Sequence, residues 1–568
     1  MNKSKRSRVV FGCALVAGLS ACESNAGPPA DTIFSGDNIV TMDPAQPTVS
    51  AVAVRGEKIV AVGALDDVMA LRGEATRVVE LGDQALLPGF IDAHGHFLLV
   101  GQNEGILGLY PPPVGDVNNI DDIVRKIRQW IEDKNIPAGE PVFGSGYDDS
   151  LLEEGRHPTR YDLDPASTDH PIVLTHVSGH LVAVNSAALA AGDITAATPD
   201  PAGGHIRRVA GSREPNGVLE ESAGRLVASG WDSAPTPDEL DGLIRRAIDV
   251  HLGYGITTIQ NGGGTGVAQS QAIRAAADRE PFKADVAAFA GAGDILNDSL
   301  QYEKSYHNGF RIAGVKFVLD GSPQGRTAWV TQPYDEGPPG MGPDYRAYGT
   351  MDAEVYKAGA AALIKRGVPF LAHANGDAAM DLMLDGVEEG VAGMDSTPDH
   401  RSVIIHAQLM RADQLDRAAR LGVVPSFFSA HAFFWGDWHR RSFGEERGSN
   451  ISPVRWAIDR GVHFTVHNDA PVVPPDIMRL VSITVNRKTR SGHVLGPDQR
   501  ATIQEALNAV TLGAAYQYFE EDTKGSITVG KQADLVILGQ NPLTTDPAEL
   551  EHIPILETFS RGRSVFKR

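Results

Sequence analysis

The middle of the chain alternates short apolar runs with helical patterns, and this alternation constrains the fold most strongly. Helical patterns occur at 238–252, 352–366 and 412–420, the last followed by Gly422, a residue that favours a left-handed helix end. Eight strand-like runs occupy residues 87–92, 256–260, 284–289, 314–319, 369–372, 402–405, 423–427 and 463–466. Such alternation is typical of parallel βα units. Eight units predict an α/β fold, a (β/α)₈ TIM barrel over residues 87–519, with its active site at the carboxyl ends of the strands.

The first two predicted strands are separated by a long segment, residues 97–250. It carries its own helical pattern at 121–134 and strand-like runs at 142–143 and 172–174. An insertion of this size at the catalytic face predicts a cap over the site.

Both ends of the chain are rich in short β-like runs. They lie at 32–34, 38–41, 52–54 and 58–62, and again at 525–527, 533–538, 557–559 and 564–566. We expect one small β-sandwich domain built from both termini, residues 32–86 and 520–568.

The charge balance excludes one class of partner. The net charge is −21, so the phosphate backbone of a nucleic acid would be repelled. Hydrophobic residues make up 42% and charged residues 22% of the chain, which is an ordinary globular composition. We expect a small-molecule substrate; a homo-oligomer is compatible with the sequence.

The N-terminus has the pattern of an export signal. Basic residues at positions 3–8 precede an apolar run at 9–19, which is shorter than the about 20 residues of a membrane-spanning helix. The run ends in Leu-Ser-Ala-Cys22, which resembles a bacterial lipobox with cleavage before Cys22 and lipid on its sulfur. A plain secretory signal is the alternative. We expect a signal peptide at 1–21, a tether at 22–31 and an exported lipoprotein at the cell envelope, facing the periplasm and held to the membrane by lipid alone.

Two histidines, His94 and His96, end the first predicted strand. Residues two apart in a strand share a face, so both imidazoles point toward the barrel mouth. Converging imidazoles suit a divalent metal ion. A pair of ordinary core or surface histidines is the alternative, and the position at a strand end favours the metal.

Polar residues mark four further predicted strands. Lys316 lies within an apolar strand, where a charge is costly without a partner. His373, His406 and Asp469 each follow a strand at the point where its loop begins. Any one of them could be a hydrogen-bonded buried polar group. Together, on the strand ends of one barrel, they predict an active site.

These residues and several longer motifs resemble one known family, the amidohydrolase superfamily. More closely, the chain is similar to the branch of N-substituted formamide deformylases and related metal-dependent hydrolases. The motifs that carry this resemblance run through most of the chain, at residues 87–96, 156–160, 178–180, 185–189, 217–221, 314–322, 373–377, 406–408 and 525–536.

The resemblance implies a metal centre and a reaction. His94, His96 and Asp469 would hold one divalent ion, and His373 and His406 a second. Lys316, carboxylated by CO₂, would bridge two Zn²⁺ ions, although other divalent metals fit the same ligands. Asp469 would also be the catalytic residue that transfers the proton. The implied reaction is hydrolysis of an amide-type C–N bond in an N-acyl or N-formyl amine.

Four further residues are candidates near this centre. His180 would orient a substrate carbonyl, or it is an ordinary polar residue at a helix start. Asp320 and Asp377 would fix imidazole or loop orientation. His467 departs from the branch, which usually has a small residue there, and it would contact substrate, add a metal contact or fill space.

Three alternatives remain open. A mononuclear deaminase or ring-opening hydrolase would have no use for a bridging carbamate on Lys316. A lipid-tethered binding protein on an inactive barrel would lack at least one ligand, and every ligand is present. A lactonase, esterase or phosphoesterase would use the same dinuclear site.

Overall fold

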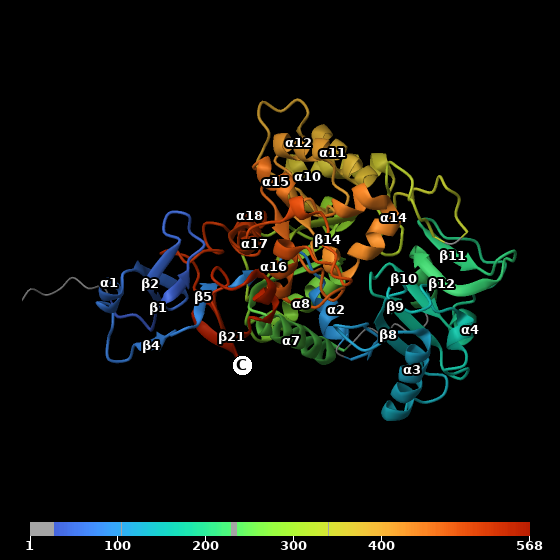
Figure 1. The fold of residues 1–568 in the computed structure, drawn as a ribbon, viewed down its shortest axis with the longest axis horizontal. Helices are drawn as coiled ribbons and strands as arrows, with labels where there is room; N and C mark the ends of the chain where they lie inside the picture. The colour runs from blue at the N-terminus through green and yellow to red at the C-terminus, as the bar shows by residue number, and fades with distance from the viewer. Residues whose placement is uncertain (1–27, 104, 229–235, 339) are drawn as a thin grey trace, which may run out of the picture.

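The computed structural model describes residues 28–103, 105–228, 236–338 and 340–568. The strands near both termini lie at one end of the molecule, the barrel in the middle and the strands of the insertion at the opposite end (Figure 1). The predicted signal peptide and Cys22 lie outside the described residues. Across the described part of the chain, no helix is both long and apolar enough to cross a membrane.

The central sheet contains eight strands, and each is parallel to its neighbours. In sheet order they are β6 (Phe90–Ile91), β13 (Ile256–Thr265), β14 (Asp285–Gly291), β15 (Phe310–Val318), β16 (Phe370–Ala374), β17 (Val403–His406), β18 (Val424–Phe427) and β19 (Thr465–Val466). The first and last strands meet just beyond their carboxyl ends, where the N–H of His96 donates to the carbonyl of Ala470 at 2.7 Å. The predicted TIM-barrel type of fold is confirmed.

Helices follow most barrel strands. They are α8 (Val267–Arg279), α9 (Ala292–Leu296), α10 (Ala353–Arg366), α11 (Asp377–Val391), α12 (Ala412–Leu421), α13 (His431–Phe434), α14 (Gly436–Ser449), α15 (Val454–Asp459), α16 (Ile477–Asn486), α17 (Ile503–Ala509) and α18 (Leu512–Gln517). Asp352 begins α10 by accepting the N–H groups of Glu354 and Val355, and Gly422 ends α12 with φ of 71°. Aspartate is a preferred residue at a helix start and glycine at a left-handed helix end, so both ends agree with the sequence.

The first predicted strand, 87–92, is two strands in the structure. Residues Ala85–Pro88 form β5 in the terminal sheet, and only Phe90–Ile91 enter the barrel. Gly89 lies between them: its N–H donates to the carbonyl of Asp534, and the next N–H donates to the carbonyl of Gly255. A Cβ on Gly89 would lie 2.5 Å from Thr257 Oγ1, so the chain changes sheets where a glycine permits close approach.

The terminal sheet combines strands from both ends of the chain. Its strands are β1 (Thr32–Val40), β2 (Thr48–Arg55), β3 (Lys58–Gly63), β4 (Arg77–Glu80), β5, β20 (Leu535–Leu538), β21 (Ile555–Ser560) and β22 (Arg563–Lys567). The rings of Phe34 on β1 and Phe559 on β21 are 5.1 Å apart, although three strand steps separate them. Three steps in a flat sheet span roughly 14 Å. The strands therefore form one continuous sheet that folds over itself, in place of the two separate sheets of a sandwich; residues 525–527 lie outside its strands.

The insertion after β6 has a sheet and a core of its own. Its strands are β7 (Leu107–Gly108), β8 (Val142–Tyr147), β9 (Ile172–His176), β10 (Leu181–Val184), β11 (Gly204–Arg208) and β12 (Pro215–Glu221). Its helices include α3 (Ile120–Lys134), α4 (Arg160–Leu163) and α5 (Ser186–Ala191), and α2 (Phe97–Asn103) and α7 (Pro237–Gly253) connect it to the barrel. Apolar side chains of α3, β8 and β9 pack in one cluster. We call this unit the cap.

Candidate active site

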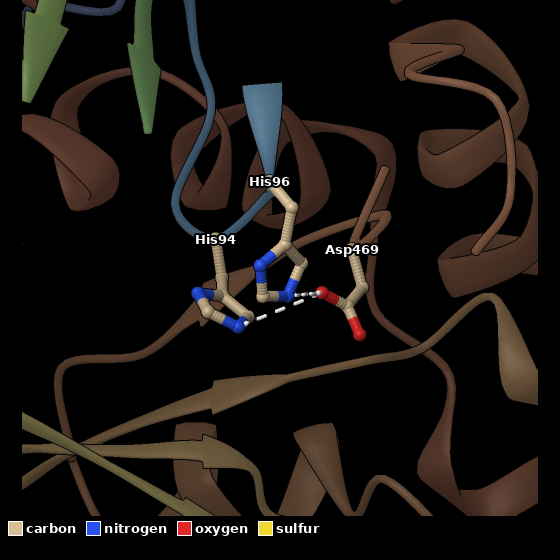
Figure 2. Close-up of side chains that lie close together, drawn as sticks. All are labelled: His94, His96 and Asp469. Atoms are coloured by element: carbon tan, nitrogen blue, oxygen red, sulfur yellow. Dashed lines mark ion pairs between the residues drawn. The ribbon is translucent and has the colours of Figure 1, made fainter. Parts of the chain in front are cut away.

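Three predicted ligands converge at the barrel mouth. His94 and His96 come from the segment after β6, and Asp469 follows β19, the strand at the other end of the sheet order; the three side chains face one another (Figure 2). Asp469 Oδ1 lies 3.1 Å from His96 Nε2 and 3.5 Å from His94 Nε2. The ligand atoms of all three lie within 4.8 Å of one another, and they form a group that could hold a metal ion.

The distances in this group suit a shared ion better than hydrogen bonds. Asp469 Oδ1 is buried and has no hydrogen-bond partner among the described residues, although both imidazoles face it. Two ligands of a tetrahedral ion, each at about 2.0–2.1 Å, lie about 3.3 Å apart. The residues present therefore fit a divalent metal.

Neighbouring residues orient the His94 ring and pack closely against it. Its Nδ1 is hydrogen-bonded to Gln260 Oε1 on β13, which leaves Nε2 for a ligand. A Cβ on Gly262 would lie 2.3 Å from His94 Cε1, so only glycine fits beside this ring. Asp469 itself has φ of 55°, a conformation that non-glycine residues rarely adopt and that clusters at functional sites.

Lys316, His373 and His406 complete the rim, on β15, β16 and β17. Lys316 Nζ lies 3.0 Å from His94 Nε2. The His373 and His406 rings are 4.5 Å apart, and His406 Nε2 lies 4.0 Å from Asp469 Oδ2. The candidate ligands of a second ion, His373 and His406, thus lie next to the group of His94, His96 and Asp469 but are less tightly spaced.

Burial keeps these groups in forms that can bind a cation. It lowers the pKa of His94, His373 and His406, so the imidazoles are neutral at pH 7. Burial also lowers the pKa of Lys316 from 10.5 to about 7. Burial alone would raise the pKa of Asp469, but the facing His96 and His94 rings hold it well below its usual range.

The two predicted supporting aspartates have different places. Asp320, fully buried after β15, accepts the Nδ1–H of His373 at 3.0 Å, and the Nε2 of that ring lies 3.3 Å from Asn375 Nδ2. Asp377, at the start of α11, accepts from the backbone of Thr331 and from Arg411, both at 2.9 Å. Asp377 therefore holds a loop, and it has no hydrogen bond to an imidazole among the described residues.

His467 lies beneath the centre rather than in the cavity. Its ring is 1% exposed, with Nδ1 2.8 Å from Ser426 Oγ and Nε2 3.1 Å from His406 Nδ1. The expected substrate contact is corrected accordingly: His467 is covered by its neighbours and positions the His406 ring. Sequence position alone does not give this contact, because it joins β17, β18 and the segment after β19.

A cavity of about 620 Å³ opens above the candidate metal ligands. The rim residues His96, Lys316, His373, His406 and Asp469 line it together with cap residues, among them His180. The insertion thus covers the site.

His180 faces the rim from the cap. Its ring lies 5.1 Å from that of His373, and its Nδ1 is 2.8 Å from Glu221 Oε2. Burial would lower the pKa of His180, but the Glu221 carboxylate outweighs burial and raises it. With Nδ1–H given to Glu221, His180 offers a second N–H at Nε2 only when it is protonated.

Three supporting residues have no role in the sequence-based prediction: Gln260, Glu221 and Ser426. Gln260 ends the second predicted strand, the kind of position that holds the other polar site residues. Glu221 closes a motif that carries the family resemblance. Ser426 lies inside an apolar strand and gives no such signal.

Comparison with known proteins agrees with this geometry. The model of the amidohydrolase family matches residues 77–566. An N-substituted formamide deformylase of Arthrobacter pascens is 27% identical over 555 residues, which cover 95% of this chain and 98% of that protein. An uncharacterized metal-dependent hydrolase of Pyrococcus horikoshii has a similar structure, with a TM-score of 0.70 and 22% identity over 91% of this chain and 99% of that one. A second such hydrolase, from Pyrococcus furiosus, gives 0.68 and 23% over the same shares.

The chain belongs to the amidohydrolase family. It is therefore a hydrolase, and its histidine and aspartate side chains at the barrel mouth are arranged as ligands for a divalent metal.

Proposed function

We propose that the protein is a metal-dependent hydrolase that cleaves the amide C–N bond of an N-formyl or N-acyl amine. The observation that carries the proposal is the convergence of two histidines and an aspartate at a cavity that residues of the barrel rim and the cap line together. The formamide deformylase relative, which matches nearly the whole chain, supports an amide substrate.

We further propose that the centre is dinuclear, with two Zn²⁺ ions and a carboxylated Lys316. A neutral amine adds to CO₂ and releases one proton, which gives a carbamate with two ligand oxygens. Lys316 is buried, and its Nζ has no carboxylate within 4.0 Å in the described part of the chain. A charged ammonium is unfavourable in such a place, which supports the neutral amine and its modification. An ammonium group offers a metal no lone pair, whereas a carbamate binds like a carboxylate.

The chain's own residues divide the work of hydrolysis. Bound divalent metal would supply Lewis acidity, which lowers the pKa of water and polarises a carbonyl oxygen. Asp469, kept ionised, takes a proton from the attacking water and passes it to the leaving nitrogen. Protonated His180 donates from Nε2 to the carbonyl oxygen, and Glu221 holds its ring toward the cavity. The cap limits access of bulk water.

The reaction is tested with matched substrates. Metal-loaded protein is assayed against an N-alkyl formamide, the corresponding N-acetyl amine, the formate ester of the matching alcohol, a lactone and a phosphotriester. Turnover of the amides above the ester and lactone supports the proposal, and Asp469→Asn should abolish it while the protein stays folded. Turnover of only the oxygen esters would overturn the C–N assignment and leave a metal-dependent esterase or lactonase.

We also propose that the protein is exported and lipid-anchored at Cys22. The support is sequence alone: a basic start, a short apolar run and a lipobox-like end. Fractionation of expressing bacteria tests the proposal. Wild-type protein should sediment with membranes, and Cys22→Ala should release it. Membrane association of the variant would contradict anchoring at this residue.

A further inference from the structure

A second buried group of metal-ligand type lies in the cap. Asp149 follows β8, His157 lies in the loop before α4, and His176 ends β9. All three are less than 9% exposed, and their ligand atoms lie within 4.8 Å of one another. None belongs to the barrel rim.

In each imidazole Nδ1 is engaged and Nε2 faces Asp149. His157 Nδ1 is 3.2 Å from the hydroxyl of Tyr147, and His176 Nδ1 is 2.8 Å from Ser178 Oγ and accepts the backbone N–H of Ser178 at 3.2 Å. Contacts at the far ring nitrogen hold both rings in orientation, with Nε2 toward Asp149.

Hydrogen bonds do not account for the atoms of Asp149, His157 and His176 that face one another. Asp149 Oδ1 and His176 Nε2 are 3.0 Å apart, and Asp149 Oδ2 and His157 Nε2 are 3.4 Å apart. Yet Asp149 Oδ1 and His176 Nε2 are both buried without a hydrogen-bond partner among the described residues, so they do not aim at each other. Ligands of one tetrahedral ion have this relation, with a separation of about 3.3 Å. The buried unpaired atoms are costly without such an ion.

A neighbouring cation does not replace the metal in this group. The Arg207 guanidinium donates to Glu220.

We propose that Asp149, His157 and His176 bind one divalent transition-metal ion, with Zn²⁺ as the best match. Two imidazole nitrogens and one carboxylate oxygen suit Zn²⁺, whereas Mg²⁺ and Ca²⁺ prefer oxygen ligands alone. His176 also lines the cavity above the barrel rim, so this site lies in the cap wall of that cavity.

The ion would fix the cap against the active site. It would join the segment after β8 to the end of β9, only four residues before His180. The neighbouring Asp148 accepts the indole N–H of Trp435 from the barrel side, so the same segment contacts both units. The cap metal is therefore a positioning element for His180 and no reaction step passes through it.

The direct test is the anomalous difference map of the full protein crystallised with ZnCl₂, with data collected on both sides of the zinc absorption edge. A peak between the three side chains supports the proposal, separately from peaks at the barrel rim. Peaks at the rim with none in the cap would overturn it and leave the proposed hydrolase intact. This measurement needs no variant and does not depend on activity.

Variants give the stoichiometry. Asp149→Asn and His157→Gln should each lower the zinc content by one ion per chain after desalting. The matched control is His205→Gln, which removes the partly exposed cap histidine that pairs with Asp200 at 2.6 Å, and it should leave zinc content unchanged. Added Zn²⁺ should raise the Tm of wild type and His205→Gln above that of His157→Gln. Equal zinc content in all variants would refute the site.

Discussion

Asp320→Asn should weaken metal binding at the barrel centre without unfolding the protein. Asp320 is fully buried, and its carboxylate accepts the Nδ1–H of His373 together with three backbone N–H groups, from Trp329, Asn375 and Gly376, at 2.8–3.2 Å. Asparagine keeps the shape but replaces one acceptor oxygen by an NH₂ group.

Either orientation of the new amide is unfavourable. If its oxygen stays on His373, the NH₂ group faces the N–H groups of Trp329 and Gly376. If it turns, His373 must present a lone pair at Nδ1 and a proton at Nε2, the wrong tautomer for a ligand. Loss of such a supporting contact typically lowers metal affinity about 10–100-fold, or about 1.4–2.7 kcal/mol.

Competition with a chelator, followed by metal analysis of the protein, measures this loss. The matched control is Asp377→Asn, because Asp377 holds Thr331 and Arg411 but no imidazole. Its metal affinity should equal that of wild type, while its Tm falls. Unchanged affinity in Asp320→Asn, with His373 still required for binding, would refute the reasoning from His373 orientation.

Three further changes have defined outcomes. Asp285→Ala removes a buried carboxylate that accepts from a lysine and an arginine. Guanidinium titration should show that the free energy of unfolding falls by about 3–5 kcal/mol. The control Asp249→Ala removes an exposed carboxylate and should lower it by at most about 1 kcal/mol. Similar losses for both would contradict the burial argument. Glu221→Gln removes the charge that raises the pKa of His180, so the alkaline limb of the kcat/KM profile should move to lower pH. An unmoved limb would exclude a protonated His180. Gly376→Ala would place Cβ 1.8 Å from a backbone carbonyl oxygen, so soluble yield and Tm should drop sharply, and a wild-type Tm would show that the loop relaxes.

The sequence identifies the strands of the barrel and most of the polar residues at its rim because both follow from local pattern. A buried parallel strand is a continuous apolar run, and its first polar residue marks the carboxyl end. Lys316, His373 and His406 lie at or near such ends. Since every strand of a barrel runs the same way, these ends meet at one rim whatever the loops do.

The split at Gly89 shows where local pattern fails. Pro88 and Gly89 favour a break in this stretch, but they do not say which sheet each half joins. The partners decide it, since Asp534 bonds one residue and Gly255 the next. Both partners are far along the chain.

By itself, the sequence determined the parallel strands of the barrel, the polar residues at its rim and the presence of a long insertion, since apolar periodicity and strand direction specify them. Only tertiary packing decided that His467 supports His406, that Asp377 holds a loop, and that Asp149, His157 and His176 face one another in the cap. Those contacts depend on ring orientation and on distances of a few ångströms between separate elements. Residue spacing along the chain does not predict these contacts.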